Sequence, residues 1–427
     1  GVLMLRYLVE RIADGEFLEL ELPIVVSGAG QALCGPGSFS GTVAPDVGGV
    51  RDDVGTLLID PYATFVHEEA DGVIRGTWLV TRSELDGSRW TIEGAGFSAF
   101  FRGRPYEGEY RGVRVDPVAV ARHVVEHAQG FAGADLGVSV VGASTAVVGT
   151  DSDEKEAAAQ ATVDAAKAAV EGAKKALDLA RAAAKANPSP ANKAAVEARK
   201  TESDAADAAK KAADELLSAA KEKARDDGGA WKLLWWDTPD CFQAIEEAFA
   251  AAGVEWVEWS GWNADRTQVL KEFRVSARVG RKQTNLSFIE GDNITETVVV
   301  EDDADLYANK VVAVGAGEGR DALRVTVAVS DTRRSKPFVL DAKHVTKRAS
   351  LERLARAELD RRQRRLRVDA IRVDASHSNA ERGTFGVGDT ILVDAEVGWI
   401  GRQRLWQRVA ELEWVGLDVC DLMLEDA

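Results

Sequence analysis

The chain has 427 residues, enough for roughly two to four domains with cores of their own. It carries 70 acidic and 53 basic side chains, and the formal charge of −17 argues against a protein that coats nucleic acid, which needs a basic surface. Cys34, Cys241 and Cys420 form no paired motif, so neither a disulfide framework nor a cysteine zinc site is expected. No apolar run reaches the length of about 18 residues that a membrane span needs, and Arg6 and Glu10 interrupt any secretory signal.

Residues 1–112 have the pattern of antiparallel β-structure, and we expect them to form a barrel or a sandwich. The segment 18–22 alternates apolar and acidic residues, as a half-buried strand does. Asp-Gly pairs at 14–15, 71–72 and 86–87 lie between strand-forming runs and indicate hairpin turns. The spacing predicts that segment 73–80 pairs with segment 90–94.

Two helix–strand segments, 113–150 and 228–292, are predicted to form one α+β domain that is split in sequence. In the first, Asp116 and Pro117 predict the start of a helix that ends near Gly130 in an αL residue, before a strand over 137–148. In the second, Thr238 is the expected cap of a helix over 239–252 that ends at Gly253, and a strand follows over 254–259.

Residues 151–227, between these two segments, are rich in alanine and in charged residues and predict a long helical hairpin. Alanine and long charged side chains favour helices, and Pro188 and Pro190 interrupt the pattern once. The first helix carries Val163, Val170 and Leu177 at seven-residue spacing, with alanines three residues after each. For the second helix the expected seam consists of the following positions: Ala198, Ala205, Ala209, Ala212, Leu216 and Ala219. The segment has 16 acidic and 14 basic residues, so most of the net charge lies elsewhere.

Residues 293–427 predict a second region dominated by β-strands, with one inserted helix. Expected strands are 295–300, 310–314, 323–329, 368–374, 390–396 and 405–414. The helix is expected over 350–366, with Ser350 as its N-cap and with Leu351, Leu354, Ala355 and Leu359 facing inward. Together these segments predict an α+β fold dominated by antiparallel strands.

One motif has the form of a metal site. His123, Glu126 and His127 match the HxxEH pattern of one class of zinc peptidases, in which two histidines share a helix face and the glutamate is the base. The pattern is short, and no third ligand can be identified downstream. We therefore interpret it as a polar stripe on an amphipathic helix, and we assign no catalytic, cofactor-binding or metal-binding residue.

Three further patterns favour structural roles. The glycine-rich segment 315–320 follows a strand but precedes another strand, so it lacks the helix N-terminus of a phosphate loop and predicts a turn. The arginines of segment 361–367 could bind nucleic acid or a carboxylate surface, but a solvated helix end is the simpler interpretation. The tryptophans between 231 and 262 could stack on carbohydrate, although packing in a core or against a subunit is favoured.

The order of these elements resembles that of a known family, the tail-tip hub or minor tail proteins of long-tailed actinobacteriophages. No single motif is diagnostic, and the resemblance covers about four-fifths of the chain by the order of its blocks. The blocks that carry it are segments 5–7, 33–41, 73–82, 94–101, 309–319, 357–362, 388–393 and 408–414. The hairpin at 151–227 departs from the family pattern.

The resemblance implies two β-barrel tube domains joined by smaller α+β domains. It implies a non-enzymatic homotrimer at the tip of the virion tail, whose six barrels continue the sixfold tube. Expected partners are the distal tail protein, the tape measure protein, a central fibre or spike and other minor tail proteins. DNA would pass through the lumen into the host without specific binding, and an acidic lining would suit such a conduit. Contact with the host surface is a further expectation.

Two other functions remain open from the sequence. One is a tail-associated cell-wall peptidase or hydrolase centred on His123, Glu126 and His127. The other is a receptor-binding tail module that uses the tryptophans and the hairpin.

Overall fold

A computed structural model describes residues 4–43, 58–302, 305–317, 319–343, 345, 348–363 and 366–427. The chain divides into two compact units. Unit 1 comprises Gly1–Gly108, Asp116–Ala146 and Leu234–Ala427, and unit 2 comprises Glu109–Val115 and Val147–Leu233. Five α-helices and mostly antiparallel strands make up the described residues, which confirms the α+β class. In the described residues no helix is both long enough and apolar enough to cross a membrane.

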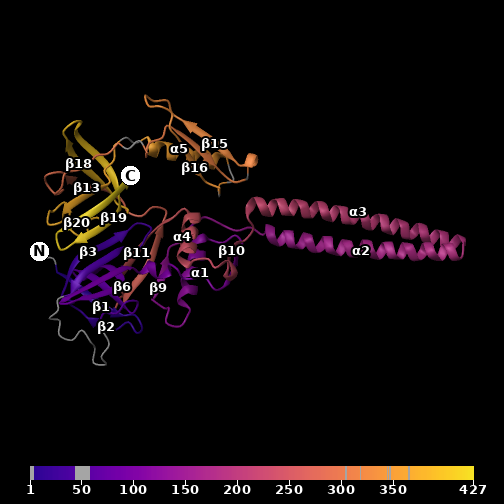
Figure 1. Ribbon diagram of the computed structural model, residues 1–427, viewed down its shortest axis with the longest axis horizontal. Helices are drawn as coiled ribbons and strands as arrows, with labels where there is room; N and C mark the ends of the chain where they lie inside the picture. The colour runs from indigo at the N-terminus through magenta and orange to yellow at the C-terminus, as the bar shows by residue number, and fades with distance from the viewer. Residues whose placement is uncertain are drawn as a thin grey trace. The chain divides into compact units, whose positions relative to one another are not determined.

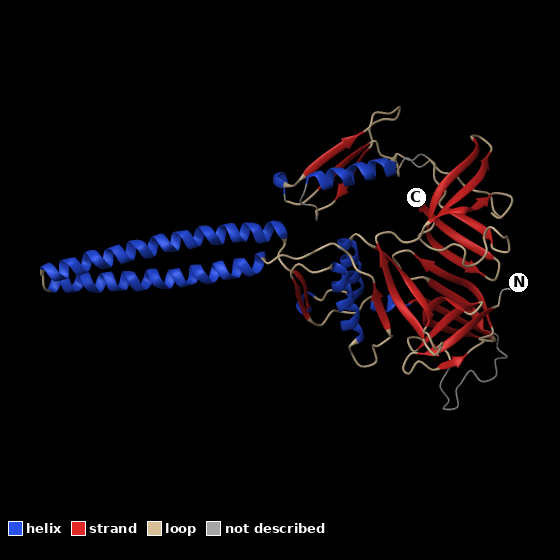
Figure 2. Cartoon of the chain, turned by 180° about the vertical axis from the view of Figure 1, so that it is seen from behind, coloured by secondary structure: helices blue, strands red, loops and turns tan. Residues whose placement is uncertain are grey.

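A twelve-stranded sheet dominates unit 1 (Figures 1 and 2). Its N-terminal strands are β1 (Leu5–Arg11), β2 (Phe17–Glu19), β3 (Ile24–Ala32), β4 (Ser38–Val43), β5 (Thr64–Ala70), β6 (Val73–Asp86) and β7 (Arg89–Gly96). Its C-terminal strands are β13 (Lys282–Ile289), β17 (Ala370–Asp374), β18 (Thr390–Val397), β19 (Gly401–Val415) and β20 (Val419–Asp426). The hydrogen-bonded order is β13-β18-β19-β3-β4-β7-β6-β5-β1-β2, with β20 joining β19 to β17.

The N-terminal and C-terminal strands are joined where β19 pairs with β3. β19 has fifteen residues. It pairs with β18 over residues 401–408 and with β3 over residues 411–414, on either side of a bulge at Ala410. This open order closes neither of the two predicted barrels among the described residues. The expectation of separate barrels missed that one long, bulged strand can serve both halves of the sheet.

One hydrophobic core extends across this junction. Phe39 and Trp78 stack from the N-terminal strands with ring centroids 5.0 Å apart. Phe385 contacts both Phe288 of β13 and Trp414 of β19, at 5.3 and 6.0 Å between centroids. All five rings belong to the same buried cluster.

The predicted Asp-Gly turns are confirmed, but the strand register differs from the expectation. Asp71 and Gly72 have positive φ angles and connect β5 to β6, and Gly87 lies between β6 and β7. The long strand β6 pairs with β5 through its first half, whereas Trp90 of β7 pairs with Leu85 near the end of β6. The alternating segment 18–22 is also shorter than predicted, because strand β2 ends at Glu19.

The helix–strand segments flanking the hairpin contribute to one three-stranded sheet. β12 (Val269–Ser276) lies between β11 (Glu255–Trp262), which is antiparallel to it, and β9 (Val138–Val141), which is parallel. The helices α1 (Pro117–Gln129) and α4 (Cys241–Ala252) pack on each other. The short 3-10 helices η1 (Phe97–Phe101) and η2 (Trp235–Asp237) complete this part.

The helix caps confirm two predictions and correct two. Asp116 accepts a hydrogen bond from the Val118 N–H at 2.9 Å, as expected for an N-cap, and Gly253 ends α4 with φ +65°. Gly130 instead has αR angles, so α1 does not end in an αL residue. The cap of α4 is Asp240, which accepts from the Gln243 N–H at 3.0 Å, and Thr238 lies outside the helix. The strand predicted over 137–148 is confirmed only as the shorter β9.

A smaller three-stranded sheet lies in the second half of the chain. Its strands are β14 (Lys310–Val314), β15 (Arg324–Ala328) and β16 (Pro337–Asp341), in the order β15-β14-β16. The helix α5 (Arg348–Arg362) covers one face with Leu351, Ala355 and Leu359. It begins two residues before Ser350, which is therefore not its N-cap, and Leu354 is exposed. Residues 364–365 of the predicted helix lie outside the described residues, and segment 295–300 forms no strand.

Unit 2 consists mainly of the predicted helical hairpin. The helices α2 (Ser152–Ala186) and α3 (Pro190–Asp227) pack along their length, and β8 (Glu109–Gly112) pairs with β10 (Trp231–Leu234) near the hairpin's ends. Val163, Val170 and Leu177 are buried as expected. The seam predicted on α3 is wrong, because its six positions are exposed. The buried positions of α3 are instead Ser203, Ala213 and Leu217.

Candidate functional site

The HxxEH histidines lie on one face of α1, next to Tyr106. The Tyr106 hydroxyl is 2.8 Å from Nε2 of His123, and the Tyr106 and His127 ring centroids are 4.2 Å apart. The Glu107 N–H donates to Nε2 of His127 at 3.1 Å, which occupies the lone pair that a metal would need. Glu126 is exposed.

The environment of these imidazoles favours their neutral form. Burial lowers the pKa of His123 and of His127, and for His127 the neighbouring His123 lowers it further. Among the described residues, no group of three or more His, Cys, Asp or Glu side chains has the geometry to hold a metal ion. In this arrangement His123 and His127 pack against the segment before β8 and form hydrogen bonds with its residues Tyr106 and Glu107.

The glycine-rich segment after β14 leads into another strand. After Gly317, a single 3-10 turn over Gly319–Asp321 precedes β15, so no helix N-terminus faces the segment. Gly315 is close-packed, since a Cβ there would lie 2.7 Å from the Val345 carbonyl oxygen. Glu318 lies outside the described residues. The predicted turn is thus confirmed on either side of that position.

The arginines after Ala355 are mostly paired within the chain. Arg361 and Arg362 bind Glu358 at 2.8 and 2.6 Å, and Arg367 lies 3.2 Å from Asp426. Arg364 and Arg365 lie outside the described residues. The described arginines therefore form ion pairs on and beside the helix end. The solvated helix end that we expected is present only in part, because the Arg362 and Arg367 side chains are 13% and 12% exposed.

The tryptophans divide into buried and exposed members. Trp256 packs in the core against Phe249 and Phe273, the latter at 5.1 Å between centroids. Trp235 and Trp236 of η2 are about half exposed and contact each other edge to face. Core packing is thus confirmed for Trp256 but does not account for the exposed pair.

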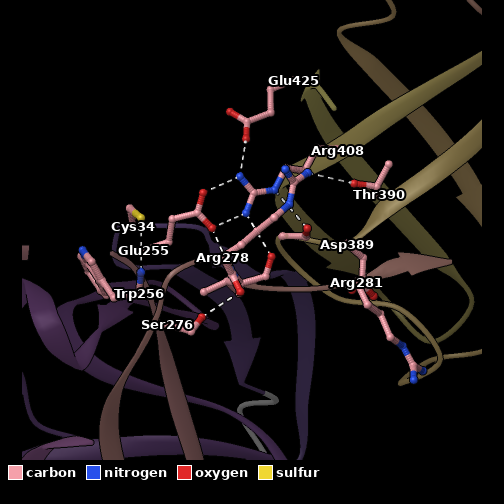
Figure 3. A network of polar contacts seen from close by, with 12 residues as sticks. Cys34, Glu255, Trp256, Ser276, Arg278, Arg281, Asp389, Thr390, Arg408 and Glu425 are labelled. Atoms are coloured by element: carbon pink, nitrogen blue, oxygen red, sulfur yellow. Dashed lines mark hydrogen bonds and ion pairs between the residues drawn. The ribbon is translucent and has the colours of Figure 1, made fainter. Parts of the chain in front are cut away.

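A charged junction, which no motif in the sequence indicated, joins three parts of unit 1 (Figure 3). Arg408 of β19 forms a two-pronged ion pair with Glu255 of β11, in which Nη1 lies 2.7 Å from Oε1. Glu425 of β20 lies 3.4 Å from the same guanidinium. The Arg408 side chain is 8% exposed, so its charge is largely removed from water.

Backbone groups provide further hydrogen bonds to Arg408 and Glu255. Arg408 donates through Nε to the Gly388 carbonyl and through Nη2 to the Val279 carbonyl, both at 3.0 Å. The Val279 N–H in turn donates to Glu255 at 2.7 Å. Burial raises the pKa of Glu255, but the hydrogen bonds from Arg408 and Val279 outweigh it, so this pKa lies below its usual value.

The N-terminal half reaches the same junction through Cys34. Cys34 has φ +53° and exchanges backbone contacts with Trp256, its N–H donating to the Trp256 carbonyl at 2.9 Å. The Trp256 N–H points back to the Cys34 sulfur at 3.5 Å. Segments near residues 34, 255 and 408 thus meet at one point, which fixes β11 against both halves of the large sheet.

Two more buried polar groups hold neighbouring segments together. His67 of β5 lies between Glu10 of β1, 2.7 Å from Nε2, and Thr77 of β6, 2.8 Å from Nδ1. Lys271 of β12 approaches Glu10 to 3.5 Å from the other sheet. Burial lowers the pKa of His67 and of Lys271. In the second group, Glu68 pairs with Arg382 and accepts from the Tyr7 hydroxyl at 3.0 Å.

The signal for these groups was present in the sequence but ambiguous. Glu10 directly follows Leu8 and Val9, and His67 and Glu68 directly follow Phe65 and Val66. An ionisable residue beside such an apolar run is costly to bury unless it finds a partner. The partners lie up to 314 residues away, as for Arg382 and Glu68. No local spacing rule connects them.

These sites connect separate parts of the chain. Each joins strands from different parts of unit 1 through charges that are satisfied inside the protein. Buried ion pairs and hydrogen bonds thus connect the sheets of unit 1. His123 and His127 lie on α1, which packs against β9 of the three-stranded sheet.

Comparisons with known proteins show the fold. No protein-family model matches the chain, and no curated protein matches its sequence. Among solved structures, it is similar to the 43 kDa tail protein of prophage MuSo2 from Shewanella oneidensis, with a TM-score of 0.52 and 10% identity over 98% of each chain. It is also similar to a tail protein from Neisseria meningitidis, with a TM-score of 0.51 and 12% identity over 99% of this chain and 97% of that one. At these identities the likeness establishes a shared fold.

Proposed function

We propose that this chain is a structural protein of a phage tail and, more specifically, the hub at the tail tip. The observation that carries the proposal is the shared fold with two tail proteins over nearly the whole chain. The order of sequence blocks supports the hub in particular.

The hub would be a ring of three copies. In such a ring, the N-terminal and C-terminal parts of each large sheet would supply the two tube-forming halves, and six halves would continue a sixfold tube. Buried ion pairs such as Arg408–Glu255 suit this role, because they hold the parts of each copy together under load. The ring would contact the distal tail protein, the tape measure protein and a central fibre or spike, and the host surface on attachment.

The lumen of this ring would pass DNA without binding it. The net charge of −17 supports an acidic lining, which repels phosphates. A structure of the assembled ring with a basic lumen would contradict this part of the proposal.

We further propose that the chain is not an enzyme. Support comes from the His127 Nε2 atom, which already accepts the Glu107 N–H. Metal analysis of the purified protein should find no stoichiometric zinc, and gels containing peptidoglycan should show no clearing. Zinc that is retained with activity and lost in His123→Ala would favour the peptidase instead.

The test of the hub has two measurements. Light scattering should give three times the chain mass of 45.9 kDa, and electron microscopy should show rings with a central channel. An antibody against the chain should label one end of the tail of purified virions. A strict monomer at all concentrations would contradict the trimer, and virions that lack the chain would contradict the tail role.

A further inference from the structure

The small sheet of β14, β15 and β16 has an open edge beside a helix. β15 is the outer strand, and α5 covers the face to which Val325 and Val327 point (Figure 1). Between β15 and α5 lies a groove of about 450 Å³. The combination of a strand edge and a flanking helix is one that proteins use to hold an extended peptide.

The backbone of β15 presents unused hydrogen-bonding groups at this edge. The Leu323 N–H donates to Ala316 and the Val329 N–H to Asn309, so odd-numbered residues turn inward to β14. Antiparallel pairing alternates, which turns the N–H and C=O groups of Thr326 and Ala328 outward. Within the described ranges, no strand pairs with them. Such an edge is a template for another strand.

The apolar side chains at the bottom of the groove are already covered by α5. Val325 and Val327 are 4% and 9% exposed, and Leu359 of α5 is 4% exposed beside them. The groups that remain for a ligand are therefore the backbone edge of β15 and the charged side chains of α5.

The wall of the groove carries charges in a defined order. Arg348, Glu352, Arg356 and Asp360 follow one another at four-residue spacing and line the groove. Glu352 and Arg356 neutralise each other at 2.7 Å. The groove therefore has a positive charge at one end, from Arg348, and a negative charge at the other end, from Asp360. Arg348 also donates a hydrogen bond to the Arg324 carbonyl at 3.4 Å. Arg348 and Asp360 are twelve helix residues apart, which corresponds to roughly 18 Å along the helix axis. An extended segment of about five to six residues spans that distance.

We propose that this groove binds an extended segment of a partner protein, which adds to β15 as an antiparallel strand. The segment would present a basic residue near its start towards Asp360, β-branched residues that favour extended backbone in its middle, and an acidic residue near its end towards Arg348. The β15 strand of a second copy matches this pattern only at its start, because it begins with Arg324 but ends with Ala328 instead of an acidic residue. The inference does not depend on the tail role.

The probe for this groove is a capped heptapeptide with the sequence Lys-Thr-Val-Thr-Val-Thr-Glu, labelled for fluorescence anisotropy. Titration with the full-length chain should give saturable binding. The same peptide with Glu first and Lys last should bind at least threefold more weakly. The double variant Arg348→Glu with Asp360→Lys should reverse that preference, because the charges of the wall are then exchanged.

The decisive variant is Thr326→Pro, which removes an outward N–H without touching a bond to β14. It should weaken binding at least tenfold, whereas the matched Thr326→Val, which keeps the N–H, should bind as the wild type does. Circular dichroism checks that both variants are folded. If the proline variant does not fold, a probe with its central peptide nitrogens methylated gives the same test on the wild-type chain.

Either of two binding results would overturn the inference: the absence of saturable binding to the wild-type chain, or equal binding of the wild type and Thr326→Pro. Self-association of the wild-type chain that Thr326→Pro abolishes would also overturn it, because the edge of β15 would then bind a second copy.

Discussion

At the scale of single residues, the large sheet depends on charges that are buried with their partners. Arg408 of β19 and Arg82 of β6 both pair with carboxylates, but the Arg408 side chain is 8% exposed, whereas Arg82 is 58% exposed and its partners Glu84 and Glu93 are 53% and 45% exposed. Ion pairs in water contribute little, whereas a buried charge that loses its partner is costly. The two positions therefore provide a matched comparison.

Arg408→Met should lower the free energy of unfolding by about 3 kcal/mol, since it leaves Glu255 without its guanidinium. Arg82→Met should change it by less than about 1 kcal/mol, because Glu84 and Glu93 remain in water. Urea denaturation followed by tryptophan fluorescence measures both. Equal effects of the two substitutions would show that the junction is no more than a surface contact.

Glu258 of β11 gives a pH-dependent prediction at the same scale. Its carboxylate accepts the Ser98 N–H at 2.5 Å, and burial raises its pKa to about 7. Because the ordinary value is 4.5, the native chain keeps a proton that the unfolded chain releases between these two pH values. The stabilisation is therefore complete below the lower value and is lost as the pH rises through about 7.

Glu258→Gln should remove that loss. Between about pH 5 and pH 7.5 the wild type should lose about 2 kcal/mol more stability than the variant. Thermal denaturation across the pH range measures the difference, with Glu126→Gln on the exposed side of α1 as the control. Parallel pH profiles for wild type and Glu258→Gln would contradict the prediction.

At the scale of elements, the alanine-rich sequence of the hairpin does not show which residues of α3 pack against α2. Alanine occurs at so many positions of α3 that its seven-residue repeat identifies no single face. The longer side chains settle the register, because Leu217 is 9% exposed against α2 and the adjacent Leu216 is 65% exposed. Leu217 packs in a small cluster with Val163 and Ala213.

Leu217→Ala should therefore destabilise the hairpin by about 2 kcal/mol, and Leu216→Ala by less than about 0.5 kcal/mol. Hydrogen exchange of the α2 and α3 amides in the full-length chain should accelerate in the first variant only. Faster exchange in Leu216→Ala instead would mean that the seam predicted from the alanine repeat was right.

At the scale of the whole molecule, the hairpin starts and ends at the same place. The Thr150 N–H donates to the Gly229 carbonyl at 2.8 Å, and the Thr150 hydroxyl donates to Asp227 at 2.8 Å. The chain thus enters and leaves the hairpin through adjacent backbone, and unit 2 forms a compact body of its own.

Deleting residues 151–227, with Thr150 joined to Gly228 through a short linker, should leave unit 1 folded. The helical signal in circular dichroism should fall sharply, while the Tm of the remaining transition changes by only a few degrees. The Leu217→Ala chain is a useful companion, because it loosens the hairpin without shortening the chain. Insoluble protein on deletion would show that the hairpin supports unit 1.

The sequence by itself determined the elements whose signals are local. Local composition and periodicity placed the hairpin helices, the strands β14 and β15 and the helix α5, because they depend on residues a few positions apart. Asp-Gly pairs placed the turns after Asp71 and Asp86, since few other residues adopt a positive φ.

Only the tertiary structure decided how those elements combine. Whether β19 closes a barrel or joins β3 depends on pairing between residues almost 400 positions apart, and Arg408, Glu255 and Cys34 meet for the same reason. The open edge of β15 was equally hidden, because a strand looks the same in sequence whether or not a neighbour covers it. Local preferences fix which residues form strands, but the free energy of packing selects their partners, and this energy is shared over the whole chain.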